Sequence, residues 1–150
     1  MIPGGSGFIG SSIAVFLKTK LKNCHILSID NLSRKTSIFN IKKLNDHNIK
    51  NIKLDLSSSK ALSKITQKFD FIIDCCAEPA VEAAKHDRGL VFNSNLKSTL
   101  NILEKAKQDN SKIVYLSTSR VYSIDKINNL FQNIELKEKL KTKKVIDEKF

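Results

Sequence analysis

Apolar and polar positions follow two different periods along this chain, and the two periods take turns. Short apolar runs bounded by polar residues predict strands at His25–Asp30, Asn51–Leu54, Phe69–Cys76 and Ile113–Leu116. Between them, apolar residues recur at helical spacing, which predicts helices over residues 8–22, around Ile38–Leu44, over residues 58–68 and from about Gly89 to Gln108. Such alternation requires a parallel sheet with helices on both faces.

The same pattern predicts which side chains are buried. The first helix has apolar residues that should face the core: Phe8, Ile9, Ile13, Val15, Phe16 and Leu17. Ile113–Leu116 is apolar throughout and predicts a buried strand. A turn is expected at Glu78-Pro79, and from Asn128 onward the chain is mostly polar and predicts no strand.

A glycine-rich run, Pro3-Gly4-Gly5-Ser6-Gly7-Phe8-Ile9-Gly10-Ser11, holds four of the five glycines. Gly5, Gly7 and Gly10 form G-x-G-x-x-G, whereas Gly4, Gly7 and Gly10 form G-x-x-G-x-x-G. In either pattern, glycines permit a tight turn, close approach to a pyrophosphate, and tight packing of helix on strand. The free N–H groups of the following helix would point at the phosphates.

Asp30 strengthens this interpretation, because it ends a predicted strand 20 residues after Gly10. A carboxylate at that place accepts hydrogen bonds from the ribose of a dinucleotide. The alternative is an aspartate that begins a turn.

Only Met1 and Ile2 precede Pro3. The first strand of a dinucleotide-binding sheet is central, and strands usually need about five residues. We therefore expect an incomplete α/β fold: a Rossmann-type doubly wound parallel sheet with its first strand truncated, in a chain that begins inside a longer protein. Without its middle strand, the sheet should be marginally stable.

The 150 residues suffice for one domain with a core, and a composition of 41% hydrophobic and 27% charged residues is typical of a globular chain. No apolar run of membrane-spanning length and no leader is seen, so we expect a cytoplasmic protein without a membrane partner. The net charge of +11 is spread along the chain without an aromatic-interleaved basic stripe, which argues against a nucleic-acid partner.

Three cysteines, Cys24, Cys75 and Cys76, lack the spacing of metal ligands, and the three histidines form no cluster. The adjacent pair Cys75-Cys76 should point to opposite faces of a strand as small core residues. No metal site is predicted.

Several segments in order resemble those of extended short-chain dehydrogenases: GGSGFIGSS, SIDNLSRKTS, FIIDCCAEPAV, FNSNLKSTLNILE and YLSTSRVYS. The chain resembles the N-terminal part of an NAD-dependent epimerase/dehydratase, and its DNLSR and STSRVY segments are most similar to the CDP-paratose 2-epimerases. The resemblance covers residues 2–124 and implies a domain division into a partial NAD-binding domain, 1–125, and a connection, 126–150, to a substrate domain that is absent.

The resemblance also implies roles for individual residues. Gly4, Gly7 and Gly10, with the backbone of Phe8 and Ile9, would hold the pyrophosphate. Asp30 and Asn31 would bind the adenosine ribose, with Ser33 and Arg34 on the adenine side. Asp55 and Leu56 would contact the adenine edge, and Cys76 and Ala77 would lie near the nicotinamide ribose. Asn95 would be a structural asparagine, and Thr118 the catalytic Ser/Thr.

Arg34 has two other interpretations: a solvated loop cation, or a partner for the 2′-phosphate of NADP. Asp30 would repel that phosphate, so NAD is the expected cofactor. Thr118, one of three consecutive hydroxyl residues, could also be a turn former.

The chain departs from the family pattern at Pro3, Asp74, Cys75-Cys76, Glu78 and Ser123, where the family commonly has Thr, His, small aliphatic residues, Gln and Gly. The catalytic Tyr-x-x-x-Lys is not found: Tyr122 and Lys126 have its spacing but follow the last predicted strand directly.

The resemblance implies the NAD-binding portion of a nucleotide-sugar epimerase that works by transient hydride transfer. Without the tyrosine–lysine pair, this chain should be inactive alone. The alternatives are a dehydratase or reductase of the same family, or a non-catalytic dinucleotide-binding module. The expected partner of the intact protein is a nucleotide sugar, and a homodimer is one option for its assembly.

Overall fold

The computed structural model describes residues 1–79, 81–118 and 123–125. The chain divides into two units, Met1–Leu116 and Ser117–Phe150. The elements of the first unit are β1 (Ile2–Pro3), α1 (Phe8–Lys20), β2 (Leu27–Asp30), α2 (Ser37–Asp46), β3 (Lys50–Lys53), α3 (Ser59–Leu62), β4 (Phe71–Asp74), α4 (Val81–His86), α5 (Arg88–Val91), the π-helical segment η1 (Phe92–Lys97), α6 (Ser98–Asp109) and β5 (Lys112–Tyr115).

All strand pairs are parallel, with β1 beside β2, β2 beside β3, and β4 beside β5. Backbone hydrogen bonds also join β1 to β4. The Met1 amine donates to Phe71 O at 2.9 Å, Ile73 N–H to Met1 O at 3.0 Å and Cys75 N–H to Pro3 O at 3.0 Å. The strands therefore follow the order β3-β2-β1-β4-β5, which is the order of a Rossmann-type sheet.

The first strand is short, as expected, but the expectation that the central place of the sheet would be empty is wrong. β1 is only two residues long, yet it is bonded to neighbours on both sides. Ile2 and Pro3 are fully buried. The expectation of marginal stability rested on an empty central place in the sheet. Because the backbone of the Met1–Pro3 segment is paired on both edges, that reason no longer applies.

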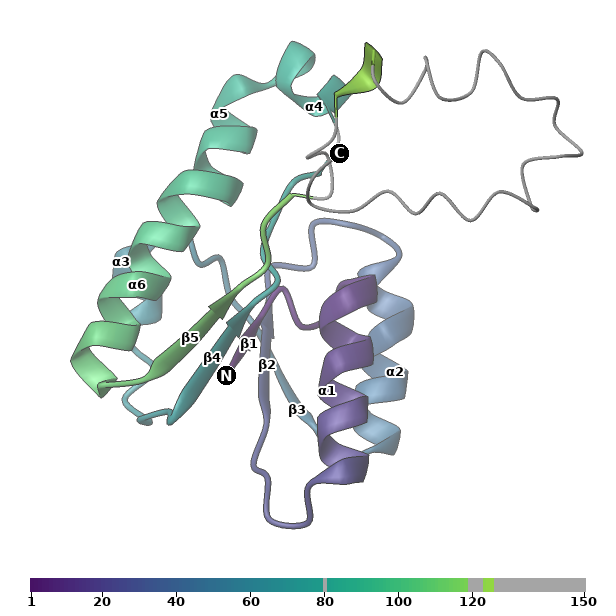
Figure 1. Ribbon diagram of the computed structural model, residues 1–150, viewed down its shortest axis with the longest axis vertical. Coiled ribbons are helices and arrows are strands. Elements are labelled where there is room, and N and C mark those ends of the chain that lie inside the picture. Colours follow the sequence, from purple (N-terminus) through teal and green to yellow (C-terminus); the bar gives the residue numbers. More distant parts are fainter. Residues whose placement is uncertain (80, 119–122, 126–150) are drawn as a thin grey trace, which may run out of the picture. The chain divides into compact units, whose positions relative to one another are not determined.

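Helices cover both faces of the sheet, as the alternating pattern predicts (Figure 1). On one face, α1 contacts β1 and β2 and α2 contacts β3, while α6 contacts β4 and β5 on the other. Successive residues supply different cores: Ile72 belongs to the cluster beneath α6, and Ile73 packs on the cluster beneath α1 and α2. Cys76 and Cys75 follow the same alternation, so the prediction that they point to opposite faces is confirmed.

The prediction for the buried face of α1 is confirmed in part. Three of the six predicted residues, Ile13, Val15 and Leu17, pack on the core, whereas Phe8 is 84% exposed and Ile9 and Phe16 are also exposed. The fully buried residues of the helix are the small ones, Gly10, Ser11 and Ala14, which let it lie close to the sheet.

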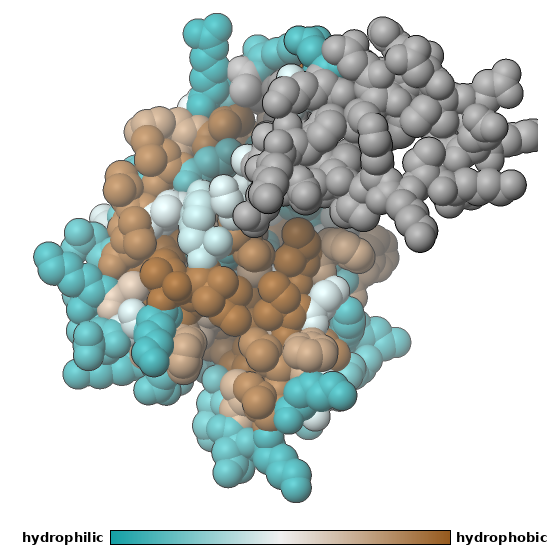
Figure 2. All heavy atoms as spheres, in the orientation of Figure 1, coloured by the Kyte–Doolittle hydropathy of each residue, from teal (hydrophilic) through white to brown (hydrophobic). Residues whose placement is uncertain are grey.

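Strand β5 also differs from expectation. Ile113 packs on the core beneath α6, but Val114, Tyr115 and Leu116 are exposed. Figure 2 shows apolar side chains gathered over the strands in the middle of its view. β5 is the last strand of the order, and α6 covers only one of its faces in the described part of the chain. Its apolar sequence therefore does not make it a buried strand.

The predicted helix boundaries hold with two exceptions. The helical pattern from about Gly89 to Gln108 is confirmed as a run from Arg88 to Asp109 whose middle, η1, is π-helical. Over residues 58–68 only Ser59–Leu62 is helical. Helix α4 was not predicted, because its sequence follows the Glu78-Pro79 turn directly.

Candidate functional site

The carboxyl ends of β1, β2, β3 and β4 meet at one pocket. Ten of the predicted site residues line it: Gly4, Gly7, Asp30, Asn31, Ser33, Arg34, Asp55, Leu56, Cys76 and Ala77. Ser37, Leu54, Cys75, Glu78, Ser94 and Ser98 also line it and were not predicted. The strand order reverses between β1 and β4, and ligands of open α/β sheets bind beyond the carboxyl ends of strands at such a point.

Steric space distinguishes the glycines of the loop. Gly4 has φ +67°, and a Cβ there would lie 2.6 Å from the backbone oxygen of Cys75. At Gly10 a Cβ would lie 2.3 Å from Gly4 O, so this glycine allows α1 to pack on the loop. At Gly7 a Cβ would meet only Gly4 O, at 3.1 Å. Of these three glycines, Gly7 is therefore the one that the packing of the chain requires least, and it lines the pocket.

Gly5 faces away from the site. A Cβ on it would collide with Ser28 Oγ at 2.2 Å and Ile2 O at 2.7 Å, and it does not line the pocket. Of the two overlapping patterns, the structure favours Gly4, Gly7 and Gly10, because Gly4 and Gly7 line the pocket and Gly10 allows α1 to pack against the loop. The sequence alone left this choice open, because both patterns have acceptable spacing.

Helix α1 begins at the pocket with Gly7 as its N-cap. No side chain caps this end, and its first turn has no acidic residue. The positive end of the helix dipole is therefore not offset by a carboxylate of the first turn, which suits an anionic group of a ligand. Phe8, Ile9 and Gly10 form this turn but do not line the pocket, so a contact through Phe8 and Ile9 would be made by their backbone.

Ser6 fastens the glycine loop to its neighbours. It is fully buried, and its hydroxyl donates to Asn51 Oδ1 at 2.9 Å, the same atom that accepts from Ser28 Oγ at 2.6 Å. Its carbonyl accepts from Asn40 Nδ2 at 2.8 Å. These bonds tie the loop to β2, β3 and α2. Sequence reasoning missed both roles, because Ser6 is a variable position of the glycine motif and Asn51 belongs to no motif.

The Asp30 carboxylate is held in place by two backbone N–H groups. Oδ2 accepts from Ser6 at 3.1 Å, and Oδ1 accepts from Leu32 at 2.9 Å. One bond reaches back to the glycine loop and the other forms a turn after β2. Each carboxylate oxygen has further acceptor capacity, so the group can still accept ribose hydroxyls.

Cys75, Cys76 and Asp74 lie where β4 reaches the pocket. Burial raises the pKa of the Cys75 thiol to about 12 and raises that of Cys76 further, so both are neutral thiols rather than nucleophiles at ordinary pH. Asp74 is 1% exposed, and its Oδ1 accepts from Cys76 N–H at 2.9 Å. Its Oδ2 has no hydrogen-bond partner among the described residues. Burial raises the pKa of this carboxyl, and it outweighs the opposing effects of the Cys76 N–H and the Thr99 hydroxyl.

Asn95, from η1, holds the segment after β4. Its Oδ1 accepts from Glu78 N–H at 2.6 Å, and its Nδ2 donates to Glu78 O at 3.2 Å. The Glu78 carboxylate in turn forms an ion pair with Arg34, from the loop after β2. The position of Asn95 therefore fits the structural role that the resemblance implied.

Thr118 belongs to the second unit, where it is exposed. Tyr122 and Lys126 lie outside the described residues. The catalytic role of Thr118 and the division at residue 125 stay predictions.

The family model of the NAD dependent epimerase/dehydratase family matches residues 1–144. The chain belongs to this family. The chain is similar to a dTDP-D-glucose 4,6-dehydratase of Dictyostelium discoideum, which is 32% identical over 126 residues that cover 81% of this chain and 29% of the relative. A CDP-paratose 2-epimerase of Salmonella typhi is 30% identical over 127 residues, covering 81% of this chain and 37% of the relative.

A solved structure shows the same fold in this family. The UDP-glucose 4-epimerase of Thermus thermophilus, in complex with NAD, superposes with a TM-score of 0.62 at 25% identity, covering 78% of this chain and 36% of that one. The chain thus spans between 29% and 37% of the length of these three proteins.

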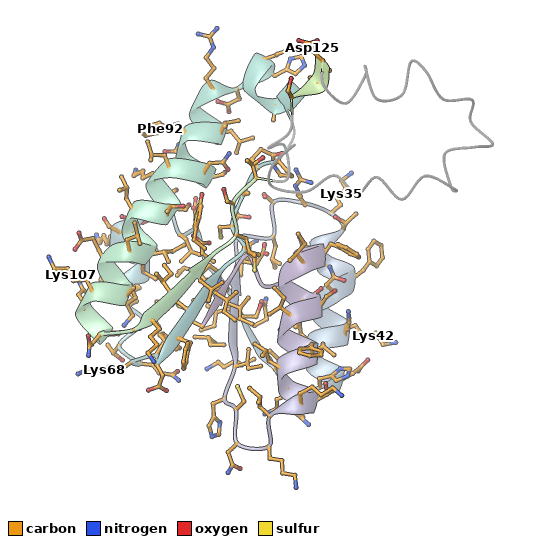
Figure 3. The ribbon with its side chains drawn as sticks, in the orientation of Figure 1. Lys35, Lys42, Lys68, Phe92, Lys107 and Asp125 are labelled. Carbon is orange, nitrogen blue, oxygen red and sulfur yellow. The ribbon has the colours of Figure 1, made fainter. Side chains whose placement is uncertain are left out.

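Among residues 1–79, 81–118 and 123–125, no three His, Cys, Asp or Glu side chains gather as metal ligands, and no helix is long and apolar enough to span a membrane. Lys35, Lys42, Lys68 and Lys107 project from separate elements or loops (Figure 3). These four lysines therefore do not form one patch.

Proposed function

We propose that this chain is the NAD-binding portion of a nucleotide-sugar epimerase similar to CDP-paratose 2-epimerase. The observation that carries the proposal is the pocket itself. It combines a glycine open to a ligand, a helix start without an acid and a fixed carboxylate beyond the neighbouring strand.

The residues of the pocket suit the parts of NAD. The backbone at Gly4, Gly7, Phe8, Ile9 and Gly10 would hold the pyrophosphate. Asp30 and Asn31 would accept the adenosine ribose, and the remaining predicted residues would line the adenine side and the nicotinamide ribose: Ser33, Arg34, Asp55, Leu56, Cys76 and Ala77. Bound NAD supplies hydride transfer, and the chain supplies position and field. Thr118 would hydrogen-bond the reacting sugar oxygen.

NAD binding by the 150-residue chain tests the proposal by titration calorimetry. Replacing Gly7 by Ala places a methyl group between backbone and pyrophosphate, and should weaken NAD binding about tenfold, since steric insertion costs roughly 1–3 kcal/mol. The matched control is Gly89→Ala in α5, where a Cβ would meet only the Asp87 side chain, at 3.2 Å. Equal NAD affinity in both variants would refute the proposed site.

Turnover is expected only from a longer protein that carries this chain, since Tyr122 and Lys126 are not placed by the sequence where the family has its catalytic pair. Incubating the 150-residue chain with CDP-paratose should give no epimer by nuclear magnetic resonance. Detectable epimerisation would contradict this expectation. The cytoplasmic location and the homodimer are part of the proposal.

A dehydratase is the second candidate, because the Dictyostelium dehydratase is at least as similar to this chain as the Salmonella epimerase. Mass spectrometry separates them, since a dehydratase removes one water from the sugar and an epimerase conserves its mass. NAD affinity without any turnover in the longer protein would favour a non-catalytic dinucleotide-binding module.

A further inference from the structure

Arg34 and Glu78 reach the same pocket from two different loops. Arg34 follows β2 and Glu78 follows β4, and their side chains form an ion pair. The backbone of Glu78 is held on both its N–H and its C=O by the Asn95 amide. The Glu78 side chain thus extends from a backbone that is held in place. It is only 14% exposed, whereas the Arg34 side chain is 48% exposed.

The position of Arg34 makes this pairing consequential. It lies four residues after Asp30, the residue whose carboxylate is proposed to bind the ribose, on the loop that follows β2. In dinucleotide-binding folds an acidic residue at the end of the second strand binds the ribose 2′-hydroxyl, and a nearby arginine accommodates a 2′-phosphate. This pocket contains both kinds of residue, with opposite preferences.

We propose that Glu78 is a specificity-determining residue, which holds the Arg34 guanidinium in an ion pair and so withholds it from a 2′-phosphate. This rests on the proposed dinucleotide function. The preference for NAD over NADP then has two sources: Asp30 repels the phosphate, and Glu78 occupies the arginine that would otherwise attract it. Both acceptors compete for the same planar guanidinium.

Removing the Glu78 charge should leave the fold intact. Arg34 is half exposed, so solvent screens its pair with Glu78 and the pair contributes little to stability, and a glutamine keeps the backbone bonds to Asn95. In Glu78→Gln, Arg34 is released to a charge-assisted bond with phosphate. Asp30 remains, so the preference for NAD should narrow rather than invert.

The test is a double-mutant cycle on the 150-residue chain, with NAD and NADP titrated into each variant by calorimetry. In Glu78→Gln, NADP should bind about tenfold more tightly, the worth of a typical hydrogen bond to a charged group, while NAD affinity changes little. Arg34→Met should abolish the gain, so that Glu78→Gln changes NADP affinity little when it is added to Arg34→Met. The matched control is Glu104→Gln, an exposed glutamate on α6, which should change neither affinity.

The outcomes separate the two proposals. If the wild type binds NAD but Glu78→Gln leaves the ratio of NADP to NAD affinity unchanged, this inference is wrong and the proposed function stands. If the gain persists without Arg34, it comes from a lost negative charge alone, and the inference is again wrong. If the folded wild type, checked by circular dichroism, binds neither dinucleotide, the proposed function fails and the inference with it.

Discussion

The two sides of the strand order, β2 and β3 on one side of β1 and β4 and β5 on the other, differ in how their polar groups are paired. On the side of β2 and β3, the buried Ser6 and Ser28 share one acceptor on Asn51, and both Asp30 oxygens accept backbone N–H groups. On the side of β4, Asp74 is equally buried, yet one of its oxygens has no partner among the described residues. The first side is a closed polar network that fixes the loop, whereas the second retains an electrostatic cost.

The same contrast appears in how the strands are covered. β2 is buried along its first three residues between neighbours on both edges, whereas β5 ends the strand order and is largely exposed. Burial therefore follows from position in the sheet more than from the apolar character of a strand. The pocket lies between the two sides, and the Arg34–Glu78 pair joins them.

The largest change in stability should come from Gly10, where α1 packs against the glycine loop that the polar network of β2 and β3 holds in place. In Gly10→Ala the new Cβ would lie 2.3 Å from Gly4 O and 2.8 Å from Gly5 Cα, both backbone atoms that cannot rotate away. We expect a loss of about 3 kcal/mol in the free energy of unfolding, measured with urea. Gly89→Ala is the control and should be neutral or slightly stabilising, since alanine favours helix. A Gly10→Ala variant as stable as wild type would mean that the loop and helix are not packed as described.

Removing the shared acceptor tests the closed network. Asn51→Ala would leave the hydroxyls of Ser6 and Ser28 buried without their acceptor, and should cost about 2 kcal/mol in urea unfolding. Asn45→Ala, at an exposed position of α2, should change stability by less than about 0.5 kcal/mol. Equal stability of the two variants would argue that the network contributes nothing.

Replacing Asp74 should increase stability, whereas replacing Gly10 or Asn51 should decrease it. Its folded pKa is raised above the ordinary 3.8, so the unfolded chain loses its proton first as the pH rises, and the stability of the folded state falls. Asp74→Asn does not ionise and should be more stable at pH 7, by on the order of 1 kcal/mol. Urea unfolding at pH 3.5 should show little difference between the two, and the gap should widen toward pH 7. A gap that is constant or narrows with pH would contradict the raised pKa.

The smallest change in stability should come from the Arg34–Glu78 ion pair, which joins the loop after β2 to the segment after β4. Glu78→Gln should alter the free energy of unfolding by less than about 0.5 kcal/mol, because the pair is partly exposed. A urea melt of this variant beside wild type measures it. A loss as large as that of Asn51→Ala would show that the ion pair supports the fold rather than cofactor choice.

The sequence by itself determined the fold class, the order of the strands and of the helices other than α4, and most of the residues that line the pocket. Those features depend on local rules: period of apolar residues, glycine spacing, and an acid at a strand end. The placement of Asp30 beside the glycine loop was predicted in this way, and its carboxylate does bond to Ser6.

Tertiary structure alone decided the rest. A two-residue β1 fills the central place because its backbone bonds to β2 and β4, which no local pattern shows. Phe8 and Phe16 face outward because small residues of α1 pack closest to the sheet. The pairing of Arg34 with Glu78 joins residues 44 positions apart, and its existence depends on how β2 and β4 end at one edge. Contacts between distant segments are set by the assembled sheet, so the sequence could supply the groups but not their partners.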